Sequence, residues 1–212
     1  MTLPVIVIGA GGHAKVLIDA LLQSAVRIIG LTDAQPGLFG TTILGVSVIG
    51  NDNVVLQHSP QSVRLVNGLG STKSISARQV LYDRFKSAGY HFASVIHPSA
   101  AVSSHANLAE GVQVMAGAVI QAGTRIGENS IVNTRASVDH DCIIGAHVHI
   151  APGATLSGSV ELGDAVHVGT GATIIQGVRV GRGSTVAAGA AVISDVPDES
   201  KVAGVPAKSL TQ

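Results

Sequence analysis

Residues 126–168 read IGENSIVNTRASVDHDCIIGAHVHIAPGATLSGSVELGDAVHV, and an aliphatic residue occupies every sixth position of this stretch. The same spacing continues in both directions, from Ile96 to Val192, without a gap. The aliphatic positions are Ile96, Val102, Leu108, Val114, Ile120, Ile126, Val132, Val138, Ile144, Ile150, Leu156, Leu162, Val168, Ile174, Val180, Val186 and Val192. A helix repeats every 3.6 residues and a strand every two, so neither produces a period of six over about 100 residues.

A small residue often stands four positions after the aliphatic one, as at Ala118 and Cys142. We therefore expect a parallel β-helix in which each hexad forms one short strand and one corner. The aliphatic side chain would fill the interior of a prism, and the small residue would fit the tight corner. Gly127, Gly163 and Gly181 directly follow aliphatic positions, where coils would approach closely. Three hexads make one coil, so the seventeen hexads give between five and six coils. The alternative fold is an ordinary β-sandwich.

The composition excludes several classes of protein. The 212 residues include 13 basic and 13 acidic side chains, 46% hydrophobic residues, 2% aromatic residues and one cysteine. Such a chain is too hydrophobic to be disordered, lacks the basic surplus and aromatic residues of nucleic-acid binders, and has no internal disulfide or CxxC zinc site. The opening MTLPVIVIGAGG resembles neither a signal peptide nor a membrane span, so we expect a soluble cytoplasmic protein.

The first ninety-five residues follow a different pattern. A buried strand over 5–8 leads into the glycine-rich turn 9–14, a helix over 15–22 and a second strand over 27–32 that ends at Asp33. This is the layout of a nucleotide-binding βαβ unit. Further expected elements are a strand over 63–67, a turn over 68–71, a helix over 76–88 with the apolar face Val80, Leu81 and Phe85, and a strand over 90–95. We predict a half-domain of three or four strands and a boundary near 94–98, with domains 1–95 and 96–212.

The glycine turn suggests a phosphate site. Backbone amides at Gly11 and Gly12 would approach a pyrophosphate at the helix N-terminus, where the helix dipole favours negative charge. Asp33 would accept hydrogen bonds from a ribose or a base. The GxGxxA pattern alone is compatible with a site for a dinucleotide such as NAD, with a site for another nucleotide, or with a simple tight turn. His13 and Lys15, at the mouth of the helix, suit a phosphate and a sugar better than a nicotinamide, although a structural His13 stays possible.

His140 and Asp141 form the strongest catalytic candidate within the coils. A carboxylate beside an imidazole raises its pKa and fixes its tautomer, which suits a general base. Residues next to each other on a strand face opposite sides, so direct contact requires a corner or bulge at this point. Stacking by 18 residues places Gly158 beside His140 and His167 beside His149. Cys142 should point into the prism and be inert, and His147 and His167 are expected at exposed strand positions without a role.

A metal site is the competing idea for the histidines. Neutral imidazoles from neighbouring chains hold Zn²⁺ in β-helical carbonic anhydrases, whose coils this chain resembles. Those enzymes use one histidine and a downstream His-x4-His pair, whereas His147 and His149 are two residues apart. We therefore expect no metal.

The coils and the tail Val202–Lys208 resemble the hexapeptide-repeat acyltransferases, which are left-handed β-helices that assemble as trimers. With the amino-terminal unit included, the whole chain resembles the nucleotide-linked 4-amino-sugar N-acetyltransferases and sialic-acid O-acetyltransferases (PglD- and NeuD-like) of bacterial surface-sugar biosynthesis. The matching stretches are Gly9–Lys15, Val95–Ala100, Asn133–Asp141 and the Gly-Val-Pro-Ala tail. Relatives often carry Gly-Asn/Asp-Asn after the third strand, whereas this chain has Gly68-Leu69-Gly70-Ser71.

The resemblance implies roles for individual residues. His140 would deprotonate the sugar amine, Asp141 would tune that base, and His149 would lie near the acetyl-CoA thioester. The backbone at Gly158, Thr170 and Ala188 would line the CoA channel between two subunits. The implied nucleotide-sugar site consists of Gly11, Gly12, His13, Lys15, Asp33 and Gly70.

The implied activity is acetyl-CoA-dependent N-acetylation of a UDP- or GDP-linked 4-amino-4,6-dideoxy sugar by a homotrimer with active sites between subunits. A sialic-acid or other sugar O-acetyltransferase is the near alternative. A non-catalytic β-helical protein and a metal-dependent hydratase are the distant ones.

Overall fold

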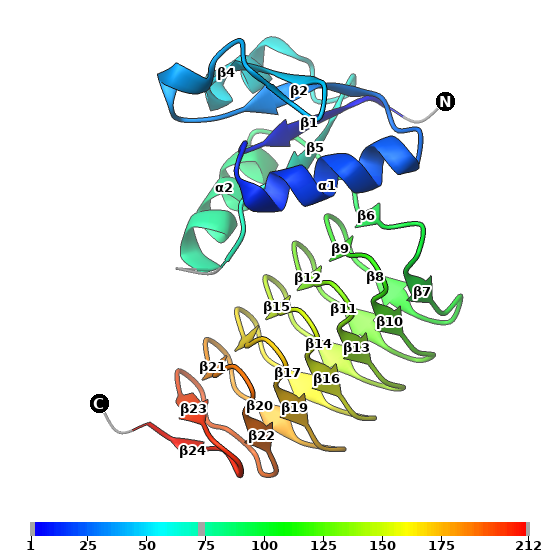
Figure 1. The fold of residues 1–212 in the computed structure, drawn as a ribbon, viewed down its shortest axis with the longest axis vertical. Coiled ribbons are helices and arrows are strands. Elements are labelled where there is room, and N and C mark those ends of the chain that lie inside the picture. The colour runs from blue at the N-terminus through cyan, green and yellow to red at the C-terminus, as the bar shows by residue number, and fades with distance from the viewer. Residues whose placement is uncertain (1–2, 72–74, 211–212) are drawn as a thin grey trace. The chain divides into compact units, whose positions relative to one another are not determined.

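The structure, a computed structural model, describes residues 3–71 and 75–210 and divides into two compact units, residues 1–98 and 99–212 (Figure 1). The sequence placed the boundary between residues 95 and 96, three residues before this division. The first unit combines a parallel sheet with helices, and the second is a stack of very short strands.

The sheet of the first unit has five strands in the order β3-β4-β2-β1-β5. They are β1 (Val5–Ile8), β2 (Ile28–Thr32), β3 (Thr42–Ile43), β4 (Val46–Gly50) and β5 (Arg64–Asn67). All are parallel to their neighbours except β3, which pairs with β4 as an antiparallel hairpin. The prediction of three or four strands was wrong because it overlooked this hairpin. Its turn uses Leu44 (φ 49°) and Gly45 (φ 81°), two positive φ angles of the kind that tight hairpins require.

Two helices, α1 (Gly12–Gln23) and α2 (Ile75–Ser87), and two 3₁₀ helices, η1 (Pro36–Leu38) and η2 (Asp52–Gln57), complete the α/β part. The predicted apolar face of α2 was partly wrong. Leu81 and Phe85 are buried, but Val80 is 66% exposed and the buried third member is Tyr82, whose ring lies 4.5 Å from that of Phe92. The expected strand over 90–95 is reduced to a single bridge between Leu65 and Phe92, followed by β6 (Val95–Ile96).

The second unit is a parallel β-helix, as the six-residue period predicted. Each of its strands up to β22 has two residues and pairs in parallel with the strand 18 residues away. These strands are β7 (Ala101–Val102), β8 (Asn107–Leu108), β9 (Gln113–Val114), β10 (Val119–Ile120), β11 (Arg125–Ile126), β12 (Ile131–Val132), β13 (Ser137–Val138), β14 (Ile143–Ile144), β15 (His149–Ile150), β16 (Thr155–Leu156), β17 (Glu161–Leu162), β18 (His167–Val168), β19 (Thr173–Ile174), β20 (Arg179–Val180), β21 (Thr185–Val186) and β22 (Ala191–Val192).

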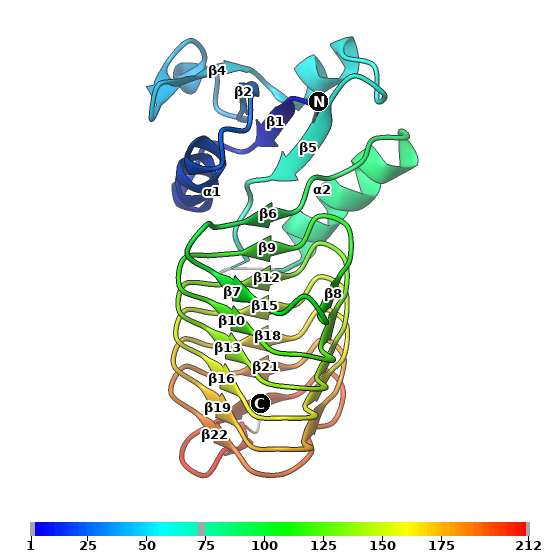
Figure 2. The same ribbon diagram turned by 90° about the vertical axis from the view of Figure 1, so that its right-hand side faces the viewer.

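The strands form the three faces of a prism (Figure 2). The first face consists of β7, β10, β13, β16, β19 and β22, and the second of β8, β11, β14, β17 and β20. The third face contains β9, β12, β15, β18 and β21 and continues into β23 (Lys201–Ala203) and β24 (Lys208–Ser209). Only the β23–β24 pair is antiparallel among the strands described in this unit, and it forms the carboxyl end of the stack.

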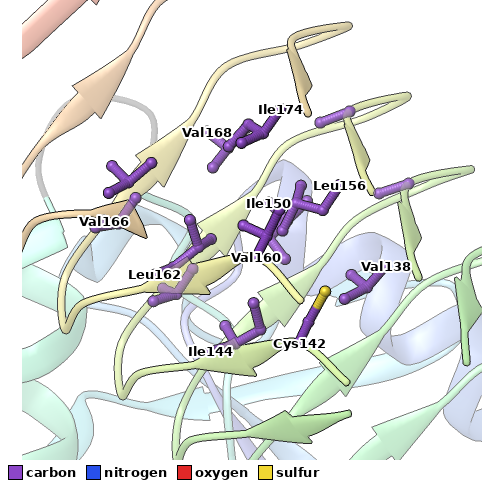
Figure 3. Close-up of a cluster of buried hydrophobic side chains, with 14 of the residues drawn as sticks. Val138, Cys142, Ile144, Ile150, Leu156, Val160, Leu162, Val166, Val168 and Ile174 are labelled. Atoms are coloured by element: carbon purple, nitrogen blue, oxygen red, sulfur yellow. The ribbon is translucent and has the colours of Figure 1, made fainter. Parts of the chain in front are cut away.

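The interior of the prism is filled by the predicted aliphatic residues (Figure 3). Every one from Val114 to Val192 is at most 3% exposed, and the small residues four positions later, such as Ala136 and Cys142, are equally buried. Ile96 departs from the pattern, because it is 42% exposed and does not fill the interior.

Each corner from the one after Leu108 to the one after Val186 contains a residue in the left-handed region, three positions after the aliphatic one. Many are glycines, but Asn129, Asp141, His147 and Ala165 occupy the same position with φ between 55° and 59°. The glycine directly after the aliphatic residue has a different role, which is to let neighbouring coils approach closely. At Gly127, an added Cβ would lie 2.5 Å from the backbone carbon of Gly145 in the next coil, so the predicted close approach of coils is confirmed.

Ala165→Gly should stabilise the protein, because glycine adopts a φ of 59° without the steric cost that alanine bears. We expect the free energy of unfolding to rise by about 1 kcal/mol. Ala187→Gly is the matched control, since Ala187 is also half-buried near a corner but has no positive φ. Chemical denaturation at one fixed protein concentration measures both. Equal destabilisation by the two substitutions would refute the strain at Ala165.

Candidate active site

The glycine turn after β1 leaves the amino end of α1 open. Gly9 has a φ of 102°, and Gly11 caps the helix without a side-chain hydrogen bond. No acidic side chain stands in the first turn of the helix. Backbone N–H groups and the positive end of the helix dipole therefore meet at one edge of the sheet, an arrangement that favours an anion.

Asp33 ties this turn to the end of β2. Its Oδ2 accepts a hydrogen bond from the backbone N–H of Ala10 at 3.0 Å, and its Oδ1 accepts one from the N–H of Gln35 at 2.9 Å. Asp33 therefore shapes the glycine turn as well as presenting a carboxylate beside it.

The turn after β5 is held by a buried arginine that the sequence analysis missed. Nη1 of Arg78 donates to the carbonyl oxygens of Asn67 and Leu69, both at 2.8 Å. Arg78 is 1% exposed, and burial lowers its pKa to about 9, so it keeps its charge at neutral pH. The Asn67 side chain completes the support, because its Oδ1 accepts from the N–H of Leu69 and its Nδ2 donates to the carbonyl of Arg78.

These turns surround a pocket of about 700 Å³. It is lined by Gly9, Ala10, Gly11, Gly12, His13, Asp33, Ala34, Asp52, Gly68, Leu69, Gly70, Ala77 and Leu81. The predicted residues Gly11, Gly12, His13, Asp33 and Gly70 are thus brought together, whereas the exposed Lys15 is not part of the lining. The pocket lies beyond the carboxyl ends of β1 and β5, where the strand order reverses, which is the usual ligand position in such sheets.

Asp52 is a lining residue that the sequence analysis missed. It begins η2, directly after β4, and its Oδ1 accepts a hydrogen bond from the hydroxyl of Thr32 at 2.6 Å. Because the β3–β4 hairpin was not predicted, the carboxylate of Asp52, the second one in the pocket, was not predicted either.

His140 and Asp141 are in direct contact on the corner between β13 and β14. Asp141 has a φ of 57°, the corner geometry that adjacent residues need to face each other, and its Oδ2 lies 2.9 Å from Nδ1 of His140. A carboxylate can only accept, so Nδ1 carries the proton and Nε2 has the free lone pair. The hydrogen bond with Asp141, and secondarily the charge of Asp139, raises the pKa of His140.

Gly158 lies one coil beyond His140, as predicted. A Cβ at Gly158 would come within 2.5 Å of His140 Nε2, so only glycine leaves room for the ring at this place. The carbonyl of His140 accepts a hydrogen bond from the N–H of Ser159 at 2.8 Å, which fixes the two coils together. The side chain of His140 is 53% exposed, so a substrate can reach the imidazole that carries the lone pair on Nε2.

His149 lies on the third face, with Nε2 3.0 Å from Nδ2 of Asn133. Its ring packs edge-on against His167 in the next coil, with the centroids 5.1 Å apart. The expectation of an exposed strand position was therefore wrong for both other histidines, because His167 is half-buried on β18 and His147 is buried. His147 is 8% exposed on a corner, where its Nδ1 lies 2.9 Å from Nδ2 of Asn129.

The residues expected around CoA fall into two groups within one chain. Gly158 shares the corner of His140, between the first and second faces. Thr170 and Ala188 lie one coil apart on the corner between the third and first faces, beside the face that carries His149. A corner between two faces of a triangular prism lies opposite the third face. A single chain therefore does not bring the two groups together.

Cys142 points into the prism, as predicted, among Val138, Ile144 and Val160 (Figure 3). Its Sγ contacts the carbonyl oxygen of Ser157 at 3.3 Å, and burial raises the pKa of the thiol. Both features disfavour the reactive thiolate.

Comparison with known proteins agrees with both halves of this description. The model of the PglD N-terminal domain matches residues 4–85, and that of the bacterial transferase hexapeptide repeats matches residues 123–158. The chain is 40% identical to PerB of Caulobacter crescentus, solved in complex with CoA and GDP-perosamine, with a TM-score of 0.91 over 98% of this chain and 97% of that one. The chain belongs to the hexapeptide-repeat acetyltransferases with a PglD N-terminal domain.

Two further relatives align over most of the chain, and a third matches only a short part of it. The acetyltransferase domain of PglB from Neisseria gonorrhoeae, solved with acetyl coenzyme A, is 38% identical over 98% of both chains, with a TM-score of 0.91. The GDP-perosamine N-acetyltransferase of Escherichia coli O157:H7 is 29% identical over 73% of this chain and 70% of that protein. An acyl-carrier-protein-dependent UDP-N-acetylglucosamine O-acyltransferase of Campylobacter concisus matches 61 residues at 42% identity, and this chain spans only 23% of its length.

Within residues 3–71 and 75–210, no three His, Cys, Asp or Glu side chains are grouped to hold a metal ion. The helices in these ranges are also too short or too polar to cross a bilayer.

Proposed function

We propose that this acetyltransferase moves the acetyl group of acetyl-CoA to the amine of a nucleotide-linked 4-amino-4,6-dideoxy sugar, with GDP as the nucleotide. The observation that carries the proposal is the accessible His140, held by Asp141 and seated over Gly158. The choice of GDP is supported by PerB, which binds GDP-perosamine, and by the N-acetyltransferase of Escherichia coli named for the same sugar. The pocket between β1 and β5 is the place for the nucleotide.

In the proposed reaction, the sugar amine attacks the carbonyl carbon of the thioester and forms a C–N bond. Nε2 of His140 takes the proton that the amine loses, while Asp141 stabilises the resulting imidazolium. The tetrahedral intermediate then collapses with cleavage of the C–S bond, the protonated His140 returns its proton to the sulfur, and CoA leaves as its thiol. A hydrogen-bond donor near the carbonyl oxygen, for which His149 is the candidate, stabilises the negative charge that develops there.

The two groups of predicted CoA residues support a site shared between subunits. His140 and Gly158 lie on the corner opposite the third face, so His149 of the partner subunit must supply the second group. The apolar side chains of Ile143, Ile175 and Ile193 are 43–53% exposed on or next to the His140 corner. Ile175 and Ile193 stack one coil apart, and exposed apolar side chains that are neighbours in this way favour a surface that another protein covers. We propose a homotrimer, the cyclic assembly expected from the family, working in the cytoplasm.

A substrate panel tests the proposal. Thiol release from acetyl-CoA is followed with GDP- and UDP-linked 4-amino sugars, and with free and CMP-linked sialic acid. We expect release with the GDP-linked amino sugar. Release with a UDP-linked amino sugar would correct the nucleotide, and release with sialic acid alone would move the enzyme to O-acetylation. No release with any acceptor, together with no CoA binding by calorimetry, would overturn the enzymatic proposal.

The pH profile should depend on Asp141. His140 accepts a proton only when neutral, so the acid limb of kcat/KM follows its pKa, which lies above the ordinary value of 6.5. Asp141→Asn removes the main cause of the raised pKa, so the limb should move to lower pH. Asp139→Asn should move it less, because Asp139 raises the pKa only through its charge and its Oδ1 accepts from the backbone N–H of His140, not from the ring. The titration of the substrate amine contributes equally to the profiles of the unsubstituted enzyme and the two variants. An acid limb that does not move in Asp141→Asn would contradict the role of Asp141 in raising the pKa of His140.

A further inference from the structure

Asp52 brings a second carboxylate to the pocket of the first unit. It stands two residues after β4, and its Oδ1 accepts a hydrogen bond from the hydroxyl of Thr32, the last residue of β2, at 2.6 Å. Thr32 is fully buried, so this bond holds the carboxylate in one orientation. No described residue hydrogen-bonds to Oδ2. Asp52 therefore lines the pocket with an oxygen that a ligand can use.

The two carboxylates of the pocket have different surroundings. The carboxyl ends of β2 and β4 are joined beside them, because the N–H of Asp33 donates to the carbonyl of Gly50 at 3.0 Å. Each oxygen of Asp33 already accepts a backbone N–H. Asp52 accepts only the Thr32 hydroxyl among the described residues. Asp33 thus shapes the turn, whereas Asp52 keeps most of its capacity to accept hydrogen bonds from a ligand.

The strand order arranges the parts of a nucleotide along the edge of the sheet. The strands follow each other as β4-β2-β1-β5 (Figure 2). A diphosphate belongs at the glycine turn after β1, and in sheets of this kind the acid at the end of the next strand, here Asp33, contacts the ribose. One more strand spacing of about 4.8 Å leads to the end of β4. The base, which the ribose carries away from the phosphates, then lies beside Asp52.

A carboxylate at this place distinguishes between bases. It can only accept, and its two oxygens match two donors that stand side by side. Guanine has such a pair, the N1–H and the 2-amino group. Uracil presents one N–H between two carbonyl oxygens, and adenine presents a ring nitrogen that must itself accept. Both of these bases would set a lone pair against the carboxylate.

We propose that Asp52 selects guanine by accepting hydrogen bonds from its N1–H and its 2-amino group. Oδ1 has lone-pair capacity beyond the bond from Thr32, and Oδ2 is open. This selection rests on the proposed function for the presence of a nucleotide sugar in the pocket, and it adds the residue that reads the base. The competing role of Asp52 is structural, since its bond to Thr32 also ties η2 to β2.

Calorimetry with four nucleoside diphosphates tests the base contact without any turnover. GDP, IDP, XDP and UDP are titrated into the full chain. IDP differs from GDP only by lacking the 2-amino group, so it should bind about tenfold or more weakly, as expected for one lost hydrogen bond to a charged group. UDP should also bind more weakly than GDP. Equal affinities for GDP and IDP, or tighter binding of UDP, would overturn the proposal.

Asp52→Asn should reverse the preference rather than abolish binding. The amide keeps an oxygen for the Thr32 hydroxyl and for N1–H, but it sets an NH₂ group against the 2-amino group of guanine. Xanthine has a carbonyl oxygen at that position, so XDP should bind this variant about tenfold more tightly than GDP does. The unsubstituted chain should show the opposite order. Equal weakening of all four nucleotides by Asp52→Asn would reveal a structural role alone and overturn the proposal.

Asp19→Asn is the matched control for this substitution. Asp19 also accepts one side-chain hydrogen bond, from Gln23 at 2.9 Å, but it lies on α1 and does not line the pocket. Its removal should leave the four affinities unchanged. Thermal melting of both variants shows whether a loss of binding comes from unfolding.

Kinetics provide a second readout of the same contact. Asp52→Asn should raise the KM for the GDP-linked amino sugar about tenfold or more. The kcat should hardly change, because the diphosphate separates the base from the reacting amine and the base is bound equally in the ground state and the transition state. A lower kcat with an unchanged KM would contradict the role in base selection.

Binding and turnover together separate two kinds of failure. A chain that prefers GDP to IDP but acetylates no GDP-linked sugar would support the selection of guanine and refute the proposed function. A chain that acetylates the GDP-linked sugar but binds GDP and IDP equally would support the function and overturn the role of Asp52. Binding of none of the four nucleotides would refute both.

Discussion

His140→Ala should lower kcat for acetyl transfer by about 10²–10⁴-fold, because no other group replaces the proton acceptor at that corner. The affinity for CoA should be nearly unchanged, since Gly158 contributes backbone and the substitution only removes a ring. His105→Ala is the control: this histidine is also exposed in the coils and stands two coils away, with no predicted role. Stopped-flow thiol release measures kcat and calorimetry measures binding. A kcat within a few-fold of the unsubstituted enzyme would remove His140 from the role of base.

Mixing two inactive variants should restore activity. When His140→Ala and His149→Ala chains are co-expressed and the mixed oligomers are purified through two tags, some interfaces combine an intact His140 from one chain with an intact His149 from the other. Every mixed trimer, whichever chain is in excess, has one such interface out of three, so we expect about a third of wild-type turnover.

The same experiment separates shared sites from sites within one chain. If both histidines of a site came from the same chain, no mixture would contain an intact site and turnover would stay at the level of the single variants. Chains purified separately and mixed afterwards, without exchange of subunits, are the control. Light scattering on the unsubstituted protein should give the mass of a trimer.

The regular features of the fold were predictable because they repeat. Each coil presents the same steric problem, so the aliphatic interior, the small corner residues and the stacking of Gly158 on His140 all follow from one period. The sequence suggested a contact between His140 and Asp141 but could not establish it, because the contact depends on the positive φ of Asp141. That angle belongs to a corner position occupied by several residue types besides glycine.

The residues that were missed act through tertiary contacts. Arg78 has the sequence context of an ordinary helix surface, and only the packing of α2 against the turn after β5 buries it. Asp52 was hidden by the short β3–β4 hairpin, whose strands are too brief to show a pattern. Asn133 could have been found from the register, because a shift of 18 residues places it beside Ala151, two residues from His149.

The most direct test of the central claim is the structure of the product. The enzyme is incubated with acetyl-CoA and the GDP-linked 4-amino sugar, and the purified product is examined by mass spectrometry and two-dimensional NMR. We predict one added acetyl group, joined by an amide to the nitrogen at C4, and no such product from His140→Ala. An acetyl group found on a sugar oxygen, or an unmodified sugar in the presence of intact enzyme and acetyl-CoA, would contradict the account.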